Sequence, residues 1–195
     1  MNIIIVCIGD WDRFTKPCID SLREHEPGVN LIIVDNGSPE PYPSGWWKSV
    51  RLNETVSYPA ALNAVLSKIN KDKWIMIANN DILFHKPFLY RVKHYDPNSI
   101  YGFYTHTAFG RDYISSWAMI FSRSLFDEVG LIDENFTPMN YEDADFCWRA
   151  VDKGFYLTAL MRDSFGIEHV DKSGRVTLNE YPNCTAHLKE KHGIS

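Results

Sequence analysis

The stretch from Trp74 to Asp81 joins an apolar run to a cluster of polar side chains. It reads Trp-Ile-Met-Ile-Ala and ends in Asn79, Asn80 and Asp81. A short unbroken apolar run of this kind is typical of a strand buried on both faces, as found in parallel sheets. Ligands of open α/β sheets bind at the carboxyl ends of such strands, where the Asp81 carboxylate is suited to Mg²⁺ or Mn²⁺. The same residues also favour a simple turn, and this alternative stays open.

A second group of carboxylates lies in segment 141–150, which reads YEDADFCWRA. At helical spacing its apolar residues form one stripe, and Asp143 falls on the shoulder of that stripe in the first turn. A half-buried carboxylate there can face a cleft and act as a general base. The helix N-terminus would lower its pKa, whereas Glu142 and Asp145 would raise it. The alternative is an acidic cluster that only complements the helix dipole.

His169 lies in the last strand-like segment, Ile167 to Val170. A neutral imidazole can bind a metal ion, so His169 is a candidate to complete a site with Asp81. A single histidine is more often structural, and the sequence alone leaves both interpretations open.

The first half of the chain alternates strands with helices, which predicts right-handed crossovers and a mainly parallel sheet. The spacing of apolar residues and turn signals gives the following elements. Strands are expected at Ile3 to Ile8, Leu31 to Val34, Val50 to Leu52 and Trp74 to Asp81, and helices at Phe14 to His25, Pro59 to Ile69 and Phe88 to Tyr95, with a loop at 38–48.

The second half is less regular. Strands are expected at 100–104, 116–121, 155–160 and 167–170, and helices at 123–129 and 142–153. Ser122 and Gly130 would cap the two ends of the first helix. Between the first two strands we expect a polar and aromatic loop that contains His106, Arg111, Asp112 and Tyr113. Residues 176–195 are predicted to form a flap or a short helix.

Composition narrows the class of protein. A chain of 195 residues with 45% apolar residues fits one globular α/β domain. The net charge of -5 and the lack of a basic stripe argue against nucleic-acid binding. The four cysteines form no C-x-x-C pair, so we expect buried thiols, no structural zinc and a reducing, cytoplasmic location. The apolar start of the chain is too short for a signal peptide, and no run is long enough to span a bilayer.

Four short motifs occur in a defined order. They are Val34-Asp35-Asn36-Gly37-Ser38, Asn79-Asn80-Asp81, the stretch from Asp133-Glu134 to Glu142-Asp143 with Trp148-Arg149, and His169. This order, on these elements, resembles the family-2 glycosyltransferases with the GT-A fold. The resemblance runs from Ile3 to about Gly174. It implies a single GT-A-type domain with a mixed, mainly parallel central sheet flanked by helices. Within 1–195, it implies a Rossmann-like nucleotide-binding half at 1–98, an acceptor and catalytic half at 99–175, and a tail or flap at 176–195.

The resemblance also implies residue roles on the nucleotide side. Asp35 would contact the base or ribose of a nucleotide-sugar donor, beside the backbone near Ile8. Asn63 would help to form the wall of the nucleotide pocket. Asn80 and Asp81 match the DXD-like pair of the family, with Asn80 near the ribose and Asp81 on the metal ion.

On the catalytic side, the resemblance implies that Asp143 deprotonates the acceptor hydroxyl. His169 matches the metal-binding histidine of the family. Trp117 and Glu142 would lie near the transferred sugar and the acceptor. The sequence departs from the family at Ser57-Tyr58-Pro59-Ala60, where a Gly-rich segment is usual, and at Asn80, where Asp is frequent.

These residues predict a metal-dependent, inverting glycosyltransferase. It would move one sugar from a UDP- or dTDP-sugar to a hydroxyl of a glycan, a lipid-linked acceptor or a protein, with Mn²⁺ or Mg²⁺ as cofactor. One alternative is a non-catalytic carbohydrate- or partner-binding module on the same fold. Another is a sugar-phosphate nucleotidyltransferase, but Gly9 to Arg13 lacks the Gly-rich basic loop that such enzymes need.

Overall fold

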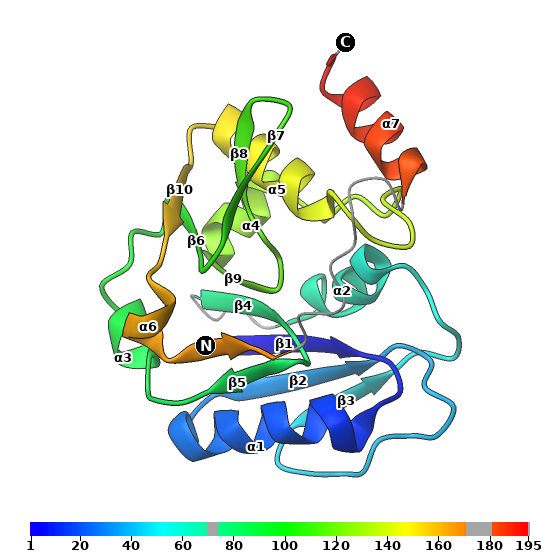
Figure 1. Ribbon diagram of the computed structural model, residues 1–195, viewed down its shortest axis with the longest axis vertical. Coiled ribbons are helices and arrows are strands. Elements are labelled where there is room, and N and C mark those ends of the chain that lie inside the picture. Colours follow the sequence, from blue (N-terminus) through cyan, green and yellow to red (C-terminus); the bar gives the residue numbers. More distant parts are fainter. Residues whose placement is uncertain (70–73, 171–180, 195) are drawn as a thin grey trace.

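A seven-stranded mixed sheet forms the centre of the computed structural model, which describes residues 1–69, 74–170 and 181–194 (Figure 1). Its strand order is β10-β6-β9-β4-β1-β2-β3. The strands are β1 (Asn2–Cys7), β2 (Asn30–Asp35), β3 (Lys48–Arg51), β4 (Trp74–Asn79), β6 (Ser99–Gly102), β9 (Ala118–Ser122) and β10 (Tyr156–Ala159). All neighbours pair in parallel except β9, which is antiparallel to both β4 and β6. The expected mixed, mainly parallel α/β sheet is therefore confirmed.

Helices cover both faces of this sheet, and each face has its own apolar core. The helical elements are η1 (Trp11–Thr15), α1 (Lys16–His25), α2 (Tyr58–Leu66), α3 (Leu89–Val92), α4 (Arg123–Val129), α5 (Glu142–Asp152), α6 (Arg162–Phe165) and α7 (Pro182–Lys191). Residues of α2, α4, α5 and α7 belong to one core, and residues of α1, α3 and α6 belong to the other. Strand β1 serves both, because Ile4 faces the first core while Ile3 and Ile5 face the second.

The parallel register brings the carboxyl ends of three strands to one edge. Cys7 of β1 pairs with Asp35 of β2, and Val6 pairs with Asn79 of β4. The polar residues that follow these strands in sequence therefore start from neighbouring positions. The carboxyl ends of the strands therefore form the edge that was expected to hold the site. The same sheet contains strands from both sides of residue 98, since β6, β9 and β10 belong to it together with β1 to β4.

The expected loop around His106 is a β-hairpin instead. Strands β7 (Thr105–Ala108) and β8 (Arg111–Ile114) pair antiparallel, with His106 opposite Tyr113. Phe109 and Gly110 both have positive φ, at 49° and 78°, which is the backbone that a two-residue hairpin turn requires. Phe rarely adopts a positive φ, so the sequence gives no signal for a hairpin turn at this position.

The expected helix from Phe14 to His25 is divided. Residues 11–15 form the π-helical turn η1, and α1 begins at Lys16 with Pro17 in its first turn. Proline lacks an N–H group, so it fits the start of a helix but not its interior. The expected helix at 88–95 is also shorter than predicted, since α3 contains only Leu89–Val92.

Several smaller features match the sequence. The Ser122 hydroxyl accepts the Leu125 N–H at 3.0 Å, and Gly130 ends α4 with φ of 87°. All four cysteines are buried thiols. None of the described helices has the length and apolar content needed to cross a bilayer. Part of the expected C-terminal flap is the helix α7, and residues 176–180 and 195 lie outside the described part of the chain.

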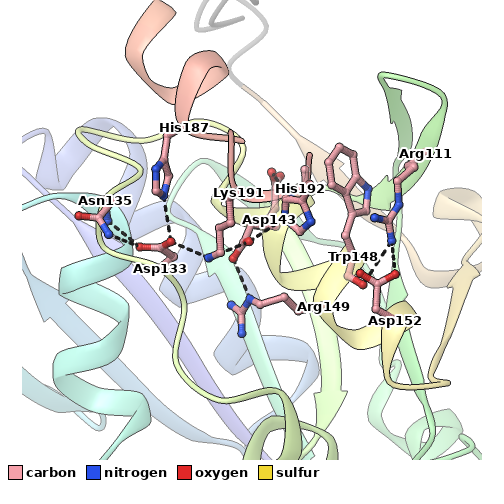
Figure 2. Close-up of polar contacts among 12 residues, drawn as sticks. Arg111, Asp133, Asn135, Asp143, Trp148, Arg149, Asp152, His187, Lys191 and His192 are labelled. Carbon is pink, nitrogen blue, oxygen red and sulfur yellow. Dashed lines mark hydrogen bonds and ion pairs between the residues drawn. The ribbon is translucent and has the colours of Figure 1, made fainter. Parts of the chain in front are cut away.

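Buried charge attaches α7 to the rest of the protein (Figure 2). Asp145 of α5 is 0% exposed, and its carboxylate contacts Arg149 at 2.8 Å and, at 2.9 Å, both Lys191 at the end of α7 and His192 directly after it. The Asp133 carboxylate contacts His187 and Lys191, which lie on the same face of α7. Burial works against ionisation of Asp133, but hydrogen bonds from Lys191 and His187 hold its pKa well below the ordinary value. Two carboxylates therefore hold the last described helix, together with the buried Cys184 and Leu188 side chains of its apolar side.

We expect Asp145→Ala to lower the free energy of unfolding by about 3 kcal/mol, since Arg149 and Lys191 would lose a desolvated counter-charge and His192 would lose its hydrogen-bond partner. The matched control is Asp127→Ala. Asp127 also pairs with an arginine one helical turn away at 2.8 Å, but its side chain is 53% exposed, so its loss should cost less than about 1 kcal/mol. Urea unfolding of the two variants measures the difference, and equal losses would contradict a structural role for the buried charge.

Candidate nucleotide and metal site

Asp81 and His169 meet at the carboxyl edge of the sheet. After β4 the chain turns and forms β5 (Ile82–Phe84), which pairs antiparallel with β11 (Ile167–His169). His169 lies opposite Ile82, and the Val170 N–H donates to the Asp81 carbonyl at 2.8 Å. The short ladder brings Asp81 Oδ2 within 3.2 Å of His169 Nε2. The two residues named from sequence as metal ligands are therefore neighbours.

The atoms of this pair that could bind a metal ion include two that make no hydrogen bond within the described part of the chain. Among the described residues, Asp81 Oδ1 and His169 Nε2 are buried and make no hydrogen bond. Two ligands held about 2.1 Å from one cation at a right angle lie about 3.0 Å apart, close to the observed separation. A carboxylate oxygen and an imidazole nitrogen are also chemically suited to Mn²⁺ or Mg²⁺. The residues present thus fit a divalent cation, although the described chain contains no group of three or more potential ligands.

Trp117 and Ser116 connect this pair to the carboxylates of α5. The Trp117 ring lies 5.1 Å from the His169 ring, and its carbonyl accepts the Asn79 N–H at 2.9 Å. The next residue, Ser116, donates its N–H to Asp143 Oδ2 at 3.1 Å and its hydroxyl to Glu142 Oε1 at 3.2 Å. Two consecutive residues before β9 therefore lie between the metal pair and the carboxylate pair.

Glu142 and Asp143 form a coupled pair at the start of α5. Burial, and then the charge of Glu142, raise the pKa of Asp143 well above that of an ordinary aspartate. Burial also raises the pKa of Glu142, against hydrogen bonds from Asn140 and Ser116. Asp145 does not contribute in the way that the sequence suggested, because its carboxylate is engaged with Arg149 and α7. The pair retains a proton more readily than an exposed carboxyl group does, which suits a general base that works near neutral pH.

Asp35 ends β2 at the same edge, opposite Cys7 of β1. It is buried, and its two oxygens accept the Ser38 N–H at 2.9 Å and Arg51 Nη1 at 2.6 Å. Arg51 also donates to the Ser38 carbonyl at 2.7 Å, so a guanidinium group is fixed beside the carboxylate. The Ile8 side chain, at the end of β1, is 52% exposed.

Asn80 and Asn63 behave differently from each other. The Asn80 amide donates to Thr15 Oγ1 at 2.9 Å, which ties the residue before Asp81 to the start of α1. Asn63 lies apart from the metal and carboxylate groups. Its amide nitrogen donates to Ile132 and Glu134, and its oxygen accepts the Ile132 N–H, so its amide joins α2 to the loop after α4.

The sequence did not identify Ser116 or Arg51 as members of this region. Arg51 pairs in register with Asp35 across β2 and β3, so correct strand pairing would have identified it. Ser116 could have been noticed only as the residue before Trp117.

Comparison with solved structures clarifies the fold. The chain is similar to the mannosyltransferase PcManGT from Pyrobaculum calidifontis in complex with GDP-Man and Mn²⁺, with a TM-score of 0.69 and 15% identity over 89% of this chain and 57% of that one. It is also similar to GalNAc-T7 with UDP, GalNAc and Mn²⁺, with a TM-score of 0.76 and 11% identity over 96% and 47% of the two chains. The chain has a GT-A-type fold. S. aureus TarS residues 1–349 match with a TM-score of 0.61 and 13% identity over 81% and 57% of the two chains.

This GT-A-type chain spans about half the length of the structures that it matches. No family model matches its sequence, and no curated protein does so either. The likeness at 11–15% identity establishes the fold. Any activity must be argued from the site itself.

The raised pKa of Asp143 predicts a pH dependence of stability. A carboxyl group whose pKa is higher in the folded than in the unfolded state makes the folded protein bind more protons, so its contribution to stability is lost as pH rises. The window begins near the pKa of an unfolded aspartate, about 3.9, and the slope is at most about 1.4 kcal/mol per pH unit. Asp143→Asn removes this group and also relieves Glu142, so the variant should gain stability relative to wild type as pH rises.

Urea unfolding at about pH 5 and about pH 8 measures this gain. Asp152→Asn serves as the control, since Asp152 lies in the same helix but is exposed and pairs with Arg111. A difference between wild type and Asp143→Asn that stays constant over this range would show that the Asp143 carboxyl is not perturbed.

Proposed function

We propose that the chain is a metal-dependent, inverting glycosyltransferase of the family-2 type, which transfers one sugar from a nucleoside diphosphate sugar to an acceptor hydroxyl. The observation that carries this proposal is the Asp81–His169 pair, 3.2 Å apart, whose Oδ1 and Nε2 atoms make no hydrogen bond within the described part of the chain, at the carboxyl edge of a GT-A-type sheet that also holds Glu142 and Asp143 of α5.

The leaving group determines what the metal pair would do. Asp81 and His169 would hold the divalent cation, which when bound would neutralise the charge that grows on the departing diphosphate. The Asn80 amide donates its hydrogen bond to Thr15 and not to the neighbouring Asp81 carboxylate. The Trp117 ring packs beside the His169 ring, with the ring centroids 5.1 Å apart and the ring planes tilted by 46°.

The nucleoside would lie over the ends of β1 and β2. The exposed Ile8 side chain offers an apolar contact, and the buried Asp35 carboxylate fixes the Arg51 guanidinium at the same place. Two of the similar structures were solved with GDP-Man and with UDP. The expectation of a UDP- or dTDP-sugar remains a prediction that the titration below decides.

Asp143 would accept the proton of the acceptor hydroxyl as the hydroxyl attacks the sugar. The Ser116 N–H fixes Asp143 Oδ2, and burial, followed by the charge of Glu142, keeps the pKa of Asp143 raised. A base on the acceptor side gives direct displacement and inversion at the sugar carbon. The aromatic rings of the β7–β8 hairpin would line the acceptor side, since the apolar faces of sugars pack against aromatic rings. The acceptor would be a glycan, a lipid-linked molecule or a protein.

Calorimetric titration with UDP, dTDP and GDP tests the metal pair. We expect one diphosphate to bind more tightly with Mn²⁺ than without it. Asp81→Ala and His169→Ala should each weaken the Mn²⁺-dependent binding by about tenfold or more, because each removes one ligand of the cation. His85→Ala is the matched control: His85 is also bonded to a carboxylate across β5 and β11, at 3.0 Å from Glu168, but both side chains are exposed.

Binding that does not depend on the cation in the wild type, or that persists in Asp81→Ala, would remove the metal site. Retained Mn²⁺-dependent binding without hydrolysis or transfer of any donor would instead favour a non-catalytic binding module.

Asp143→Asn tests the general base. The change keeps the size of the side chain and removes its ability to take a proton, so transfer or donor hydrolysis should fall by about 10² to 10⁴. Binding of the diphosphate should stay within about twofold of wild type, because Asp143 is expected to act on the acceptor. Asp152→Asn again provides the control, and turnover at the wild-type rate in Asp143→Asn would exclude Asp143 from the mechanism.

A further inference from the structure

The polar side chains that follow β2 are buried and already hydrogen-bonded. The Asp35 carboxylate is 1% exposed and accepts the Ser38 N–H and Arg51 Nη1. The Asn36 amide is 6% exposed, donates to the Val56 carbonyl at 2.9 Å and accepts the Val56 N–H at 3.0 Å. Neither side chain therefore offers a nucleoside at this edge of the sheet an accessible polar atom.

Ser38 joins this segment to the end of β1. Its hydroxyl accepts the Gly9 N–H at 2.9 Å, and its carbonyl accepts an N–H of Arg51 at 2.7 Å. The Tyr42 hydroxyl donates to the Gly9 carbonyl at 2.7 Å, so both backbone groups of Gly9 are engaged. Ser38 itself is only 3% exposed. It therefore links the Arg51 guanidinium to the turn that follows Ile8, while its own polar groups stay covered.

Arg51 keeps hydrogen-bonding groups that a ligand can reach. It is the last residue of β3, it lies opposite Asp35 at the carboxyl end of this parallel pair, and its side chain is 38% exposed. Asp35 and Ser38 each take one N–H from the two terminal nitrogens. A guanidinium carries five N–H groups and no acceptor, so three N–H groups have no acceptor within the described part of the chain. Arg51 is thus a fixed, planar array of donors at the nucleoside edge.

A group that only donates discriminates between bases. Guanine presents O6 and N7 as two adjacent acceptors, which a guanidinium binds with two parallel N–H groups. Uracil and thymine present O4 next to the N3–H donor, and adenine presents N7 next to an amino donor, so one N–H of the guanidinium would meet another donor. Cytosine offers O2 and N3, but O2 lies beside the ribose, whereas O6 and N7 of guanine lie on the edge away from the sugar. A carboxylate in the same place would instead bind the N3–H of uracil.

We infer that Arg51 contacts the base of the nucleotide, that Asp35 acts by holding Arg51, and that the donor is a GDP-sugar. This inference rests on the proposed function for the place of the nucleoside. It departs from the UDP- or dTDP-sugar expected from the sequence, because that expectation gave the base or ribose contact to the Asp35 carboxylate itself.

Calorimetric titration of the wild-type chain in Mn²⁺ tests the choice of base. We expect GDP to bind about tenfold or more tightly than UDP or CDP, which is the discrimination that one bidentate contact provides. Inosine diphosphate keeps O6 and N7 and should bind within about threefold of GDP. The 7-deaza analogue of GDP lacks N7 and should bind about tenfold or more weakly than GDP.

Arg51→Lys tests the residue. Lysine keeps a positive charge beside the buried Asp35 but cannot present two parallel donors, so the preference for GDP over UDP should fall below about threefold. The matched control is Arg123→Lys. Arg123 is also bonded to a carboxylate, that of Asp127 at 2.8 Å, and to backbone carbonyls, but it follows β9 at the amino end of β4. The control should keep the wild-type preference. If Arg51→Lys fails to fold, the analogue series on the wild-type chain still decides.

UDP or CDP that binds as tightly as GDP, or equal binding of GDP and its 7-deaza analogue, would overturn the inference. An equal loss of all nucleotides in Arg51→Lys would also overturn it, since a contact to phosphate or ribose does not distinguish bases. A preference for UDP that is lost in Asp35→Asn would place the base contact on Asp35.

Failure of the proposed function would look different. It would appear as binding that does not depend on Mn²⁺, or as binding without transfer, and the preference between bases could still be measured in either case. A chain that binds no nucleotide would overturn both.

Discussion

The site depends on the attachment of the first turn of α5 to the start of β9. Ser116 makes this attachment with two donors of one residue, its N–H to Asp143 and its hydroxyl to Glu142. Because β9 pairs with β4, the same attachment places the two carboxyls at the edge where Asp81 follows β4. The geometry of the candidate base is thus set partly by the residue that precedes the strand interrupting the parallel sheet, and partly by its own helix, where the Ala144 N–H donates to Asp143 Oδ1 at 2.8 Å.

Most of the architecture was accessible from the sequence because two periodicities are clear. The buried strands β1, β2 and β4 are short apolar runs closed by polar residues, and α2 and α5 carry apolar side chains at helical spacing. The rule that ligands gather at the carboxyl ends of parallel strands then placed Asp35 and Asp81 correctly on one edge. The chemistry of imidazole made His169 a candidate partner for Asp81, and the resemblance to a known family pointed to the same pair.

The remainder could not be predicted, because it depends on contacts between distant segments. The β7–β8 hairpin turns at Phe109, whose positive φ no propensity suggests. The role of Ser116 requires knowing that β9 begins beside α5, and the ion pairs of Asp145 require the position of α7, which docks from the far end of the chain. Burial determines the pKa of Asp143, and burial is a property of the packed molecule rather than of a local sequence.

The three-residue ladder between β5 and β11 has a consequence for folding. It is the contact that holds His169 beside Asp81, although the two residues lie far apart in the chain. A cation that binds both would favour the state in which the ladder is formed, by about 2.7 kcal/mol when its concentration is a hundred times its dissociation constant. A bound cation would thus stabilise the pairing of β11 with β5. The resistance of this region to proteases or to amide hydrogen exchange would then report what fraction of the protein has metal bound.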